Sequence, residues 1–212
     1  TVLANNGDAI SGYELRVKQG SSVVKTVPVA AGQTTQAVVV DTSTTNYTFD
    51  VRAKNKAGWG EYSPASAPRR GVTAPGAPTG VAASEGDNRV GVTWTAGAAN
   101  GAAAGEIRYE YSVNGGGWRN DWVSGGTNGS GTIGNGQVNN NGSYTIRVRA
   151  YTEMDGVRYN GDPSPASNSV APYGPIAQPS VTATQSGQSV KFTWTAPARN
   201  GRDLTVKYSI NG

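Results

Sequence analysis

A chain of 212 residues with 30 glycines, 11 prolines, no cysteine and no histidine has room for one or two turn-rich domains. The missing cysteine and histidine exclude disulfides and thiolate chemistry, and they remove the usual general base and the commonest neutral metal ligand. A net charge of +4, with no apolar run near the roughly 20 residues that a bilayer requires, argues against nucleic acid binding and membrane insertion.

The remaining composition favours short strands over helices. Charged residues make up 15% of the chain and apolar residues 36%, with valine, alanine and tyrosine prominent rather than leucine. Residues that are β-branched or aromatic fit a pleated, half-buried surface. We therefore expect an all-β protein.

The first segment alternates polar and apolar residues, as half-buried strands do. Strands are predicted at 11–18, 23–29, 37–40 and 46–54, with a last strand near 66–72. A Pro-Gly-Ala-Pro junction at 75–78 predicts a domain boundary, because paired prolines stiffen a linker and cannot extend a ladder.

The middle segment contains seven predicted strands, and a second proline-bearing junction at 172–175 separates it from a third segment. The predicted strands of the middle segment are 80–83, 89–95, 106–113, 117–123, 131–138, 144–152 and 167–171. Those of the third segment are 180–183, 189–195 and 203–210.

Two near-identical strands, NRVGVTWT ending after Trp94 and QSVKFTWT ending after Trp194, show an internal repeat. An Asn-Gly pair follows each tryptophan by six positions, at Asn100 and Asn200, and Asn6-Gly7 corresponds to them at the start. Tyr111 and Tyr208 are likewise equivalent. We therefore predict three domains: 1–74, lacking its first two strands; 75–173, complete; and 174–212, with its first three strands only.

These linked features resemble tandem fibronectin type III domains of a bacterial-type extracellular or surface protein. The resemblance rests on the proline-rich starts, the tryptophan near the end of the second strand, the Asn-Gly loop, and the tyrosine that opens NYTFDVRAKN and SYTIRVRAYT. It implies seven-stranded, immunoglobulin-like β-sandwiches in which Trp94 and Trp194 fill the space between the sheets. It also implies that Tyr47 and Tyr144 are structural residues whose hydroxyls bind backbone near Val40 and Val138.

The stretch GGWRNDWV supplies the candidate binding residues Trp118, Arg119 and Trp122. If it is a regular strand, even spacing places both indoles on one face, where they could contact a polysaccharide or a protein surface. The alternative is that one ring caps the edge of the core and the other covers backbone or a neighbouring loop.

Other conspicuous residues have structural interpretations. Trp59 is expected to pack beneath the final strand of its domain, and the glycine-rich run 125–136 is expected to be a flexible connection rather than a phosphate loop. Opposite charges on neighbouring strands predict cross-strand pairs among Glu14, Arg16, Asp50 and Arg52, and among Glu110, Arg147 and Arg149. We expect no catalytic residue, metal site or cofactor.

The sequence favours a non-catalytic structural spacer or adhesive segment of a longer extracellular or cell-surface stalk, fibre or filament. Its partners would be neighbouring fibronectin type III domains of the same chain or filament. One alternative is an accessory, carbohydrate-binding module of a secreted polysaccharide-degrading enzyme. A variant of the spacer hypothesis has residues 174–212 of one copy completing the first domain of another by strand exchange.

Overall fold

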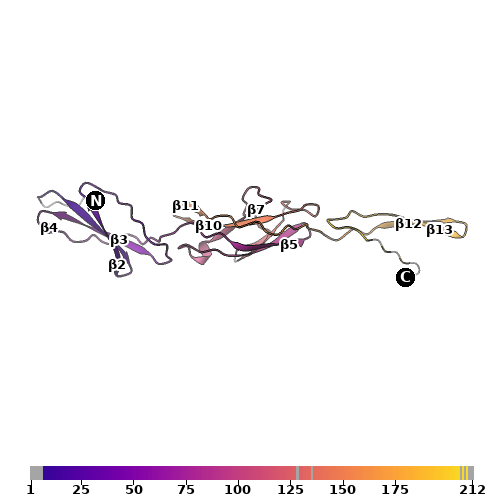
Figure 1. The fold of residues 1–212 in the computed structure, drawn as a ribbon, viewed down its shortest axis with the longest axis horizontal. Coiled ribbons are helices and arrows are strands. Elements are labelled where there is room, and N and C mark those ends of the chain that lie inside the picture. The colour runs from indigo at the N-terminus through magenta and orange to yellow at the C-terminus, as the bar shows by residue number, and fades with distance from the viewer. Residues whose placement is uncertain (1–6, 128, 135, 206, 208, 210–212) are drawn as a thin grey trace. The chain divides into compact units, whose positions relative to one another are not determined.

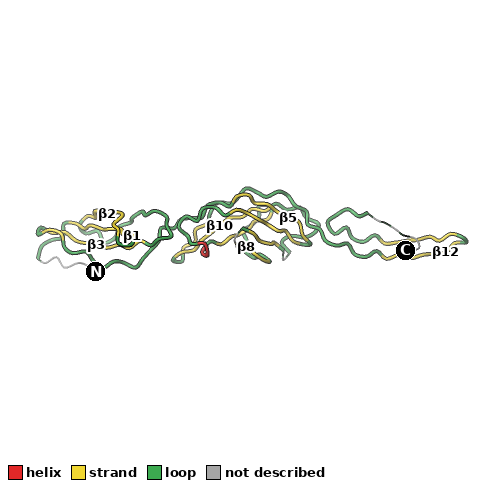
Figure 2. Tube along the Cα trace, turned by 90° about the horizontal axis from the view of Figure 1, so that it is seen from below, coloured by secondary structure: helices red, strands yellow, loops and turns green. Residues whose placement is uncertain are grey.

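The computed structural model describes residues 7–127, 129–134, 136–205, 207 and 209. The fold is all-β, built from antiparallel strands with one short 3₁₀ helix, η1 (Ala104–Glu106), drawn red in Figure 2. The chain divides into two compact units. Unit 1 holds the described residues up to Pro75 with Ala99–Ile107 and Thr152–Tyr159, and unit 2 holds Gly76–Ala98, Arg108–Tyr151 and the described residues from Asn160 onward.

Unit 1 contains a four-stranded sheet in the order β2-β1-β3-β4, drawn in indigo and violet in Figure 1. The predicted strands at 11–18, 23–29 and 46–54 are confirmed, whereas the runs 37–40 and 66–72 form no regular strand. The strands are β1 (Gly12–Gln19), β2 (Ser22–Ala30), β3 (Tyr47–Asn55) and β4 (Gly58–Trp59).

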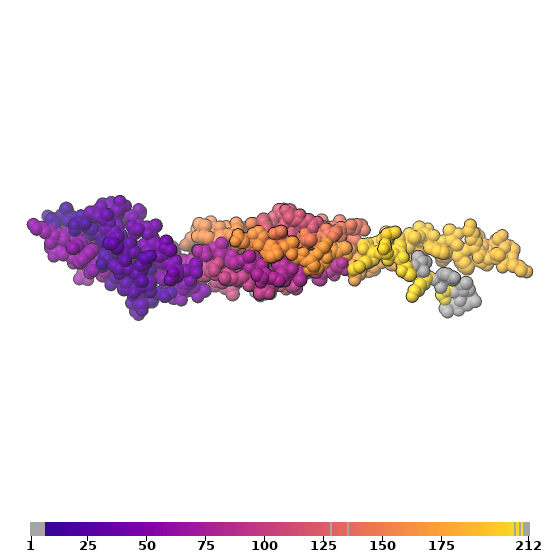
Figure 3. Space-filling model, in the orientation of Figure 1, coloured from indigo at the N-terminus to yellow at the C-terminus, as the bar shows by residue number. Residues whose placement is uncertain are grey.

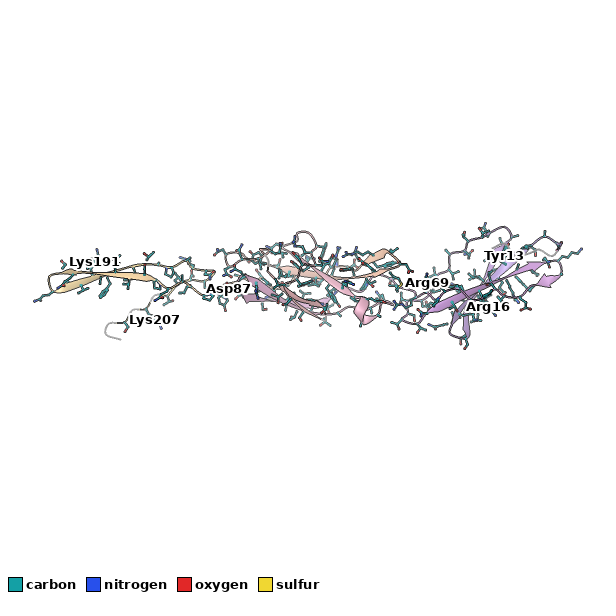
Figure 4. The ribbon with its side chains drawn as sticks, turned by 180° about the vertical axis from the view of Figure 1, so that it is seen from behind. Tyr13, Arg16, Arg69, Asp87, Lys191 and Lys207 are labelled. Atoms are coloured by element: carbon teal, nitrogen blue, oxygen red, sulfur yellow. The ribbon has the colours of Figure 1, made fainter. Side chains whose placement is uncertain are left out.

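The two faces of the unit 1 sheet differ in character. Tyr13 and Arg16, labelled in Figure 4, lie an odd number of positions apart in β1 and therefore point to opposite faces of the sheet. The apolar face carries Tyr13, Leu15 and Val51, which line an open hollow of about 580 Å³. The opposite face carries the charged pairs described below. This sheet therefore presents apolar side chains that the described residues do not fully cover.

Two further sheets enclose a core. One has the order β5-β6-β9-β8 and the other β11-β10-β7. In Figure 3 the earlier, magenta residues lie along one side of this part and the later, orange residues along the other. The strands are β5 (Thr79–Gly86), β6 (Arg89–Thr95), β7 (Arg108–Val113), β8 (Ser124–Thr127), β9 (Ser130–Ile133), β10 (Ile146–Met154) and β11 (Val157–Asn160).

The core between these sheets is built from buried apolar residues of their strands. Alternate residues of β6 are buried, ending with Trp94, which is 6% exposed. Burial of this much apolar surface is the main stabilising contribution to the fold. The buried apolar residues here include Val90, Val92, Trp94, Tyr109, Tyr111, Ile133, Val138, Ile146, Val148 and Val170.

The predicted last strand at 167–171 is replaced by an irregular segment that pairs with β10 at every third residue. The amides of Ser164, Ser167 and Val170 donate to the carbonyls of Val148, Ile146 and Tyr144. The same spacing recurs in unit 1, where Ser63, Ser66 and Arg69 donate to Val51, Phe49 and Tyr47.

The motif Ser-Pro-Ala-Ser explains this spacing. Proline has no N–H and fixes φ near −65°, so Pro64 and Pro165 cannot act as donors in a regular β-ladder. The serine hydroxyls take up the remaining donors: Ser164 Oγ accepts from the Val148 amide at 3.0 Å, and Ser167 Oγ accepts from the Ile146 amide at 2.9 Å. The edge is thus built from side-chain as well as backbone hydrogen bonds.

Residues 180–195 form a two-stranded hairpin, β12 (Ser180–Ser186) and β13 (Ser189–Thr195). Trp194, expected in a core, is 49% exposed, because the described residues place no second sheet over the hairpin. In the predicted third strand at 203–210, the described residues 203–205, 207 and 209 form no strand. Residues 206, 208 and 210, which include Tyr208, lie outside the described part of the chain.

Candidate functional site

Trp122, one of the predicted binding residues, lies against the aromatic core. Its ring stacks on Trp94 with a centroid distance of 5.4 Å and an interplanar angle of 30°, and it meets Tyr111 at 4.7 Å. Trp94 also contacts Tyr109 at 5.1 Å. The Trp122 indole N–H donates to the carbonyl of Tyr109 at 3.2 Å, so its polar atom is satisfied where it packs.

The course of the backbone explains why Trp118 and Trp122 do not share a face. Residues 117–123, predicted as one strand, instead pass from one sheet to the other. Arg119 exchanges two backbone hydrogen bonds with Tyr111 of β7, whereas the Val123 amide donates to Thr132 of β9. Trp122 lies on the stretch that crosses between these two edges, so its side chain enters the space between the sheets.

Two glycines make room for this indole. A Cβ atom on Gly126 would overlap Cδ1 of the Trp122 ring, and a Cβ atom on Gly131 would overlap its Cε3 and Cζ3. Gly126 also has a φ of +80°, which favours glycine. The glycine-rich run predicted as a flexible connection therefore includes β8 and β9, with backbone lying directly against a tryptophan.

Trp118 lies under an arginine on the outer side of β10. The Arg149 guanidinium lies 4.5 Å from the centroid of the Trp118 ring and forms an ion pair with Glu110 at 2.9 Å. Glu110 is buried, so the arginine both neutralises a shielded carboxylate and shields one ring face. The half-buried Trp118 ring is thus held in place by residues of the sheet.

Arg119, the third predicted binding residue, is exposed and pairs with Asp121. Its Nε and Nη2 donate to the two oxygens of Asp121 at 3.0 Å and 2.6 Å. The hydroxyl of the fully buried Tyr111 also donates to Asp121, at 2.6 Å. A buried phenol and a surface arginine thus share one carboxylate.

This arrangement shifts two pKa values in opposite directions. The hydrogen bonds from Arg119 and then from Tyr111 lower the pKa of Asp121 to about 2. Burial, assisted by the hydrogen bond to Asp121, raises the pKa of Tyr111 to about 12. The stability from the Asp121 shift is present above about pH 4 and is lost as the pH falls toward 2.

Tyr111→Phe should reduce the fall in the free energy of unfolding that occurs as the pH rises above 10. Because the pKa of Tyr111 is raised in the folded state, its contribution is present below pH 10 and is lost as the pH rises toward about 12. Urea midpoints measured at pH 8, 10 and 11 should fall more steeply for the unmodified chain than for the variant. Tyr173→Phe, at an exposed position, is the control, and parallel slopes for Tyr111→Phe and the unmodified chain would contradict the assignment.

Unit 1 carries the predicted charge pairs on the outer face of its sheet. The pairs are Arg16–Asp50 at 2.8 Å and Arg52–Glu14 at 2.7 Å, and Lys18 approaches Asp50 at 3.6 Å. Hydrogen bonding from Arg16 lowers the pKa of the buried Asp50. The predicted cross-strand pairing is confirmed here and at Glu110–Arg149.

Aromatic rings cover these arginines. Tyr62 lies under the Arg16 guanidinium with 3.3 Å to the ring centroid, and its hydroxyl donates to Glu14. Trp59, expected to pack beneath the final strand, is 43% exposed and lies 4.7 Å from the Arg52 guanidinium. Both units therefore stack arginine on aromatic rings beside their cross-strand ion pairs.

One part of the chain matches the model of a known family. Residues 3–69 match the fibronectin type III domain. The fold is accordingly all-β, of the fibronectin type III or immunoglobulin-like β-sandwich class. A comparison with curated proteins finds no match to the chain.

Solved structures were also compared with the chain, and 249 of their chains match. Among them is the crystal structure of chicken CNTN1 FN1-FN3 domains, which is 18% identical over 91% of this chain and 67% of that chain, with a TM-score of 0.38.

The tyrosines that the fibronectin type III resemblance singles out differ in burial. Tyr47 is buried at the start of β3. Tyr144 is half-buried, and its hydroxyl accepts a hydrogen bond from the Asn139 amide at 3.1 Å, one residue beyond the expected region at Val138. Gly142 lies against the Tyr144 ring, where a Cβ atom would overlap it.

The described residues include neither a candidate metal site nor a candidate membrane-spanning helix. No group of three or more Asp and Glu side chains there could hold a metal ion, and no helix there is long and apolar enough to cross a membrane.

The sequence did not predict a role for Asn140, a buried asparagine in the run NNNG. The polar composition of this run indicates a loop, and nothing in it indicates that Asn140 is buried.

Proposed function

We propose that this chain is a non-catalytic spacer and adhesive segment of a longer extracellular or cell-surface protein built from tandem fibronectin type III domains. Its partners are the neighbouring domains of the same chain or filament. The observation that carries the proposal is one enclosed aromatic core, at residues 79–170, flanked in the sequence by two sheets with open apolar faces.

The open faces support a role within a larger array. In unit 1, Tyr13, Leu15 and Val51 line the hollow beside the sheet. In the β12–β13 hairpin, apolar side chains that alternate along the strands remain exposed, namely Val181, Val190, Phe192 and Trp194. An isolated hairpin is at best marginally stable, and apolar sheet faces are stable when they pack against another layer. Further strands of the parent protein would supply those layers.

The ionisable groups support a structural role over a catalytic one. The buried carboxylates of Asp50 and Glu110 are each engaged by an arginine across a strand pair, where they hold the sheet together. General acid–base catalysis needs a group that is within reach of a substrate and is titratable near the working pH. Asp121, with its pKa lowered to about 2, remains a carboxylate at neutral pH and binds Arg119 and Tyr111.

Affinity electrophoresis through gels that contain chitin or insoluble glucan separates the spacer from a carbohydrate-binding accessory module. We expect the migration of the chain to be unchanged by either polysaccharide, relative to a non-binding reference protein. Trp118→Ala, which removes the half-buried outer ring, is the matched variant and should migrate like the unmodified chain. Retardation of the unmodified chain that Trp118→Ala abolishes would establish the accessory module instead.

A further inference from the structure

The Asn-Gly pairs that mark the repeat adopt one backbone conformation. Asn100 and Asn200 have φ values of 48° and 47°, and Gly101 and Gly201 have φ values of 89° and 92°. Two successive residues with positive φ form a tight turn that favours asparagine and glycine. A turn alone does not require the long-range contacts that both pairs also make.

In unit 2, Asn200 forms three hydrogen bonds to residues far earlier in the chain. Its carbonyl accepts from the Gly174 amide at 3.1 Å, and its side-chain Nδ2 donates to the carbonyl of Pro175 at 2.6 Å. Its Oδ1 accepts from Nδ2 of Asn140 at 2.6 Å. The backbone and both side-chain groups of Asn200 are therefore engaged with the linker 172–175 and the loop that precedes Tyr144.

The surface that receives this loop is formed by the turn between β5 and β6 and by the loop that precedes Tyr144. Asn140 is 3% exposed, and its Nδ2 also donates to Asp87, labelled in Figure 4, at 2.7 Å. Gly201 lies so close to this surface that a Cβ atom would overlap the carbonyl oxygens of Asn140 and Pro172. Glycine is therefore favoured at position 201 for two reasons: its φ is positive, and any larger side chain would overlap the neighbouring carbonyl oxygens.

The two contacts with the linker backbone recur within unit 1. The Asn100 carbonyl accepts from the Thr73 amide at 3.1 Å, and its Nδ2 donates to the carbonyl of Ala74 at 2.7 Å. A Cβ atom on Gly101 would overlap the carbonyl oxygen of Gly71. The linker residues differ, Thr-Ala in one and Gly-Pro in the other, but the backbone groups that the asparagine binds are the same.

We propose that the Asn-Gly pair six residues after the repeat tryptophan is a docking element that binds the linker and end loop of the preceding fibronectin type III domain. It recognises backbone N–H and C=O groups, so one loop sequence can serve linkers of different composition. The proposal deepens the spacer function and rests on it, because a fixed junction would make such a spacer stiff. Buried, hydrogen-bonded polar groups at a junction restrict its geometry.

Amide hydrogen exchange on the full chain tests the docking element at each site separately. Gly201→Ala should speed exchange of the Gly174 amide by about tenfold or more, the effect of losing one hydrogen bond, and leave the Thr73 amide unchanged. Gly101→Ala should do the reverse. Asn200→Gly, which keeps the turn but removes the side chain, should act on Gly174 in the same direction as Gly201→Ala.

Gly187→Ala is the matched control. Gly187 also has a positive φ, of 62°, but a Cβ atom there would meet no neighbour, so neither amide should change. Protected β10 amides in every variant show that the fold is intact. Exchange at Gly174 and Thr73 that none of these variants alters would overturn the docking element and leave the spacer proposal standing. If the chain is retained on polysaccharide while Gly201→Ala affects only the Gly174 amide and Gly101→Ala affects only the Thr73 amide, the spacer proposal is overturned and the docking element stands.

Discussion

Trp94→Ala is expected to lower the free energy of unfolding by about 3–5 kcal/mol, the range for truncating a large buried aromatic residue. The indole is 6% exposed and contacts both Tyr109 and Trp122, so its removal leaves a cavity between the sheets. Urea unfolding followed by circular dichroism measures the effect through the midpoint at constant slope.

Trp194 provides an internal control for this prediction. It occupies the equivalent position of the repeat but is 49% exposed. Trp194→Ala should change the free energy of unfolding by about 0.5 kcal/mol or less, as for other surface substitutions. Equal losses for the two variants would contradict the claim that Trp94, unlike Trp194, lies in an enclosed core.

Gly131→Ala is expected to cost about 1–3 kcal/mol, because the added methyl group overpacks the core against Trp122. Gly131 has no positive φ, so backbone strain contributes little and the effect isolates the contact between the methyl group and the ring. The near-ultraviolet circular dichroism of the tryptophans should change together with the urea midpoint.

The control for this substitution is Gly117→Ala. A Cβ atom at Gly117 meets no neighbour and the residue is exposed, so the midpoint should stay within about 0.5 kcal/mol of the original. If Gly131→Ala were equally neutral, Trp122 would not be packed on β9 as the structure shows.

Features with a strict period were predictable from the sequence. Alternation of apolar residues predicts β1, β3, β6 and β10, and the spacing of Trp94 and Trp194 predicts an internal repeat. Charges on neighbouring strands predicted the Arg16–Asp50 and Arg149–Glu110 pairs. These successes share one cause, since side-chain direction along a strand is fixed by its period of two.

Features that break this period were not predictable. Trp118 and Trp122 have even spacing, but the crossing between Arg119 and Val123 destroys the alternation that would have placed them on one face. The serines of Ser-Pro-Ala-Ser pair at every third residue. Trp194 matches Trp94 in sequence, but the described residues place no second sheet over its hairpin, and local sequence does not indicate this difference.

The Asn-Gly pairs show how far a local motif can be interpreted. Asparagine followed by glycine predicts a turn, and both pairs form one with positive φ. Nothing in two residues indicates that Asn200 also binds Gly174 and Asn140, because these partners are distant in the chain. The tertiary role becomes visible only where the contacts with the linker backbone recur at Asn100.

Residue-resolved hydrogen exchange across the whole chain tests the central claim, that one enclosed core is flanked by sheets that need further layers. The account predicts the slowest exchange at buried positions of β6, β7 and β10, such as Val92, Tyr111 and Val148, with much faster exchange throughout β12 and β13. Amides of β12 and β13 that exchange as slowly as those of β10 would contradict it.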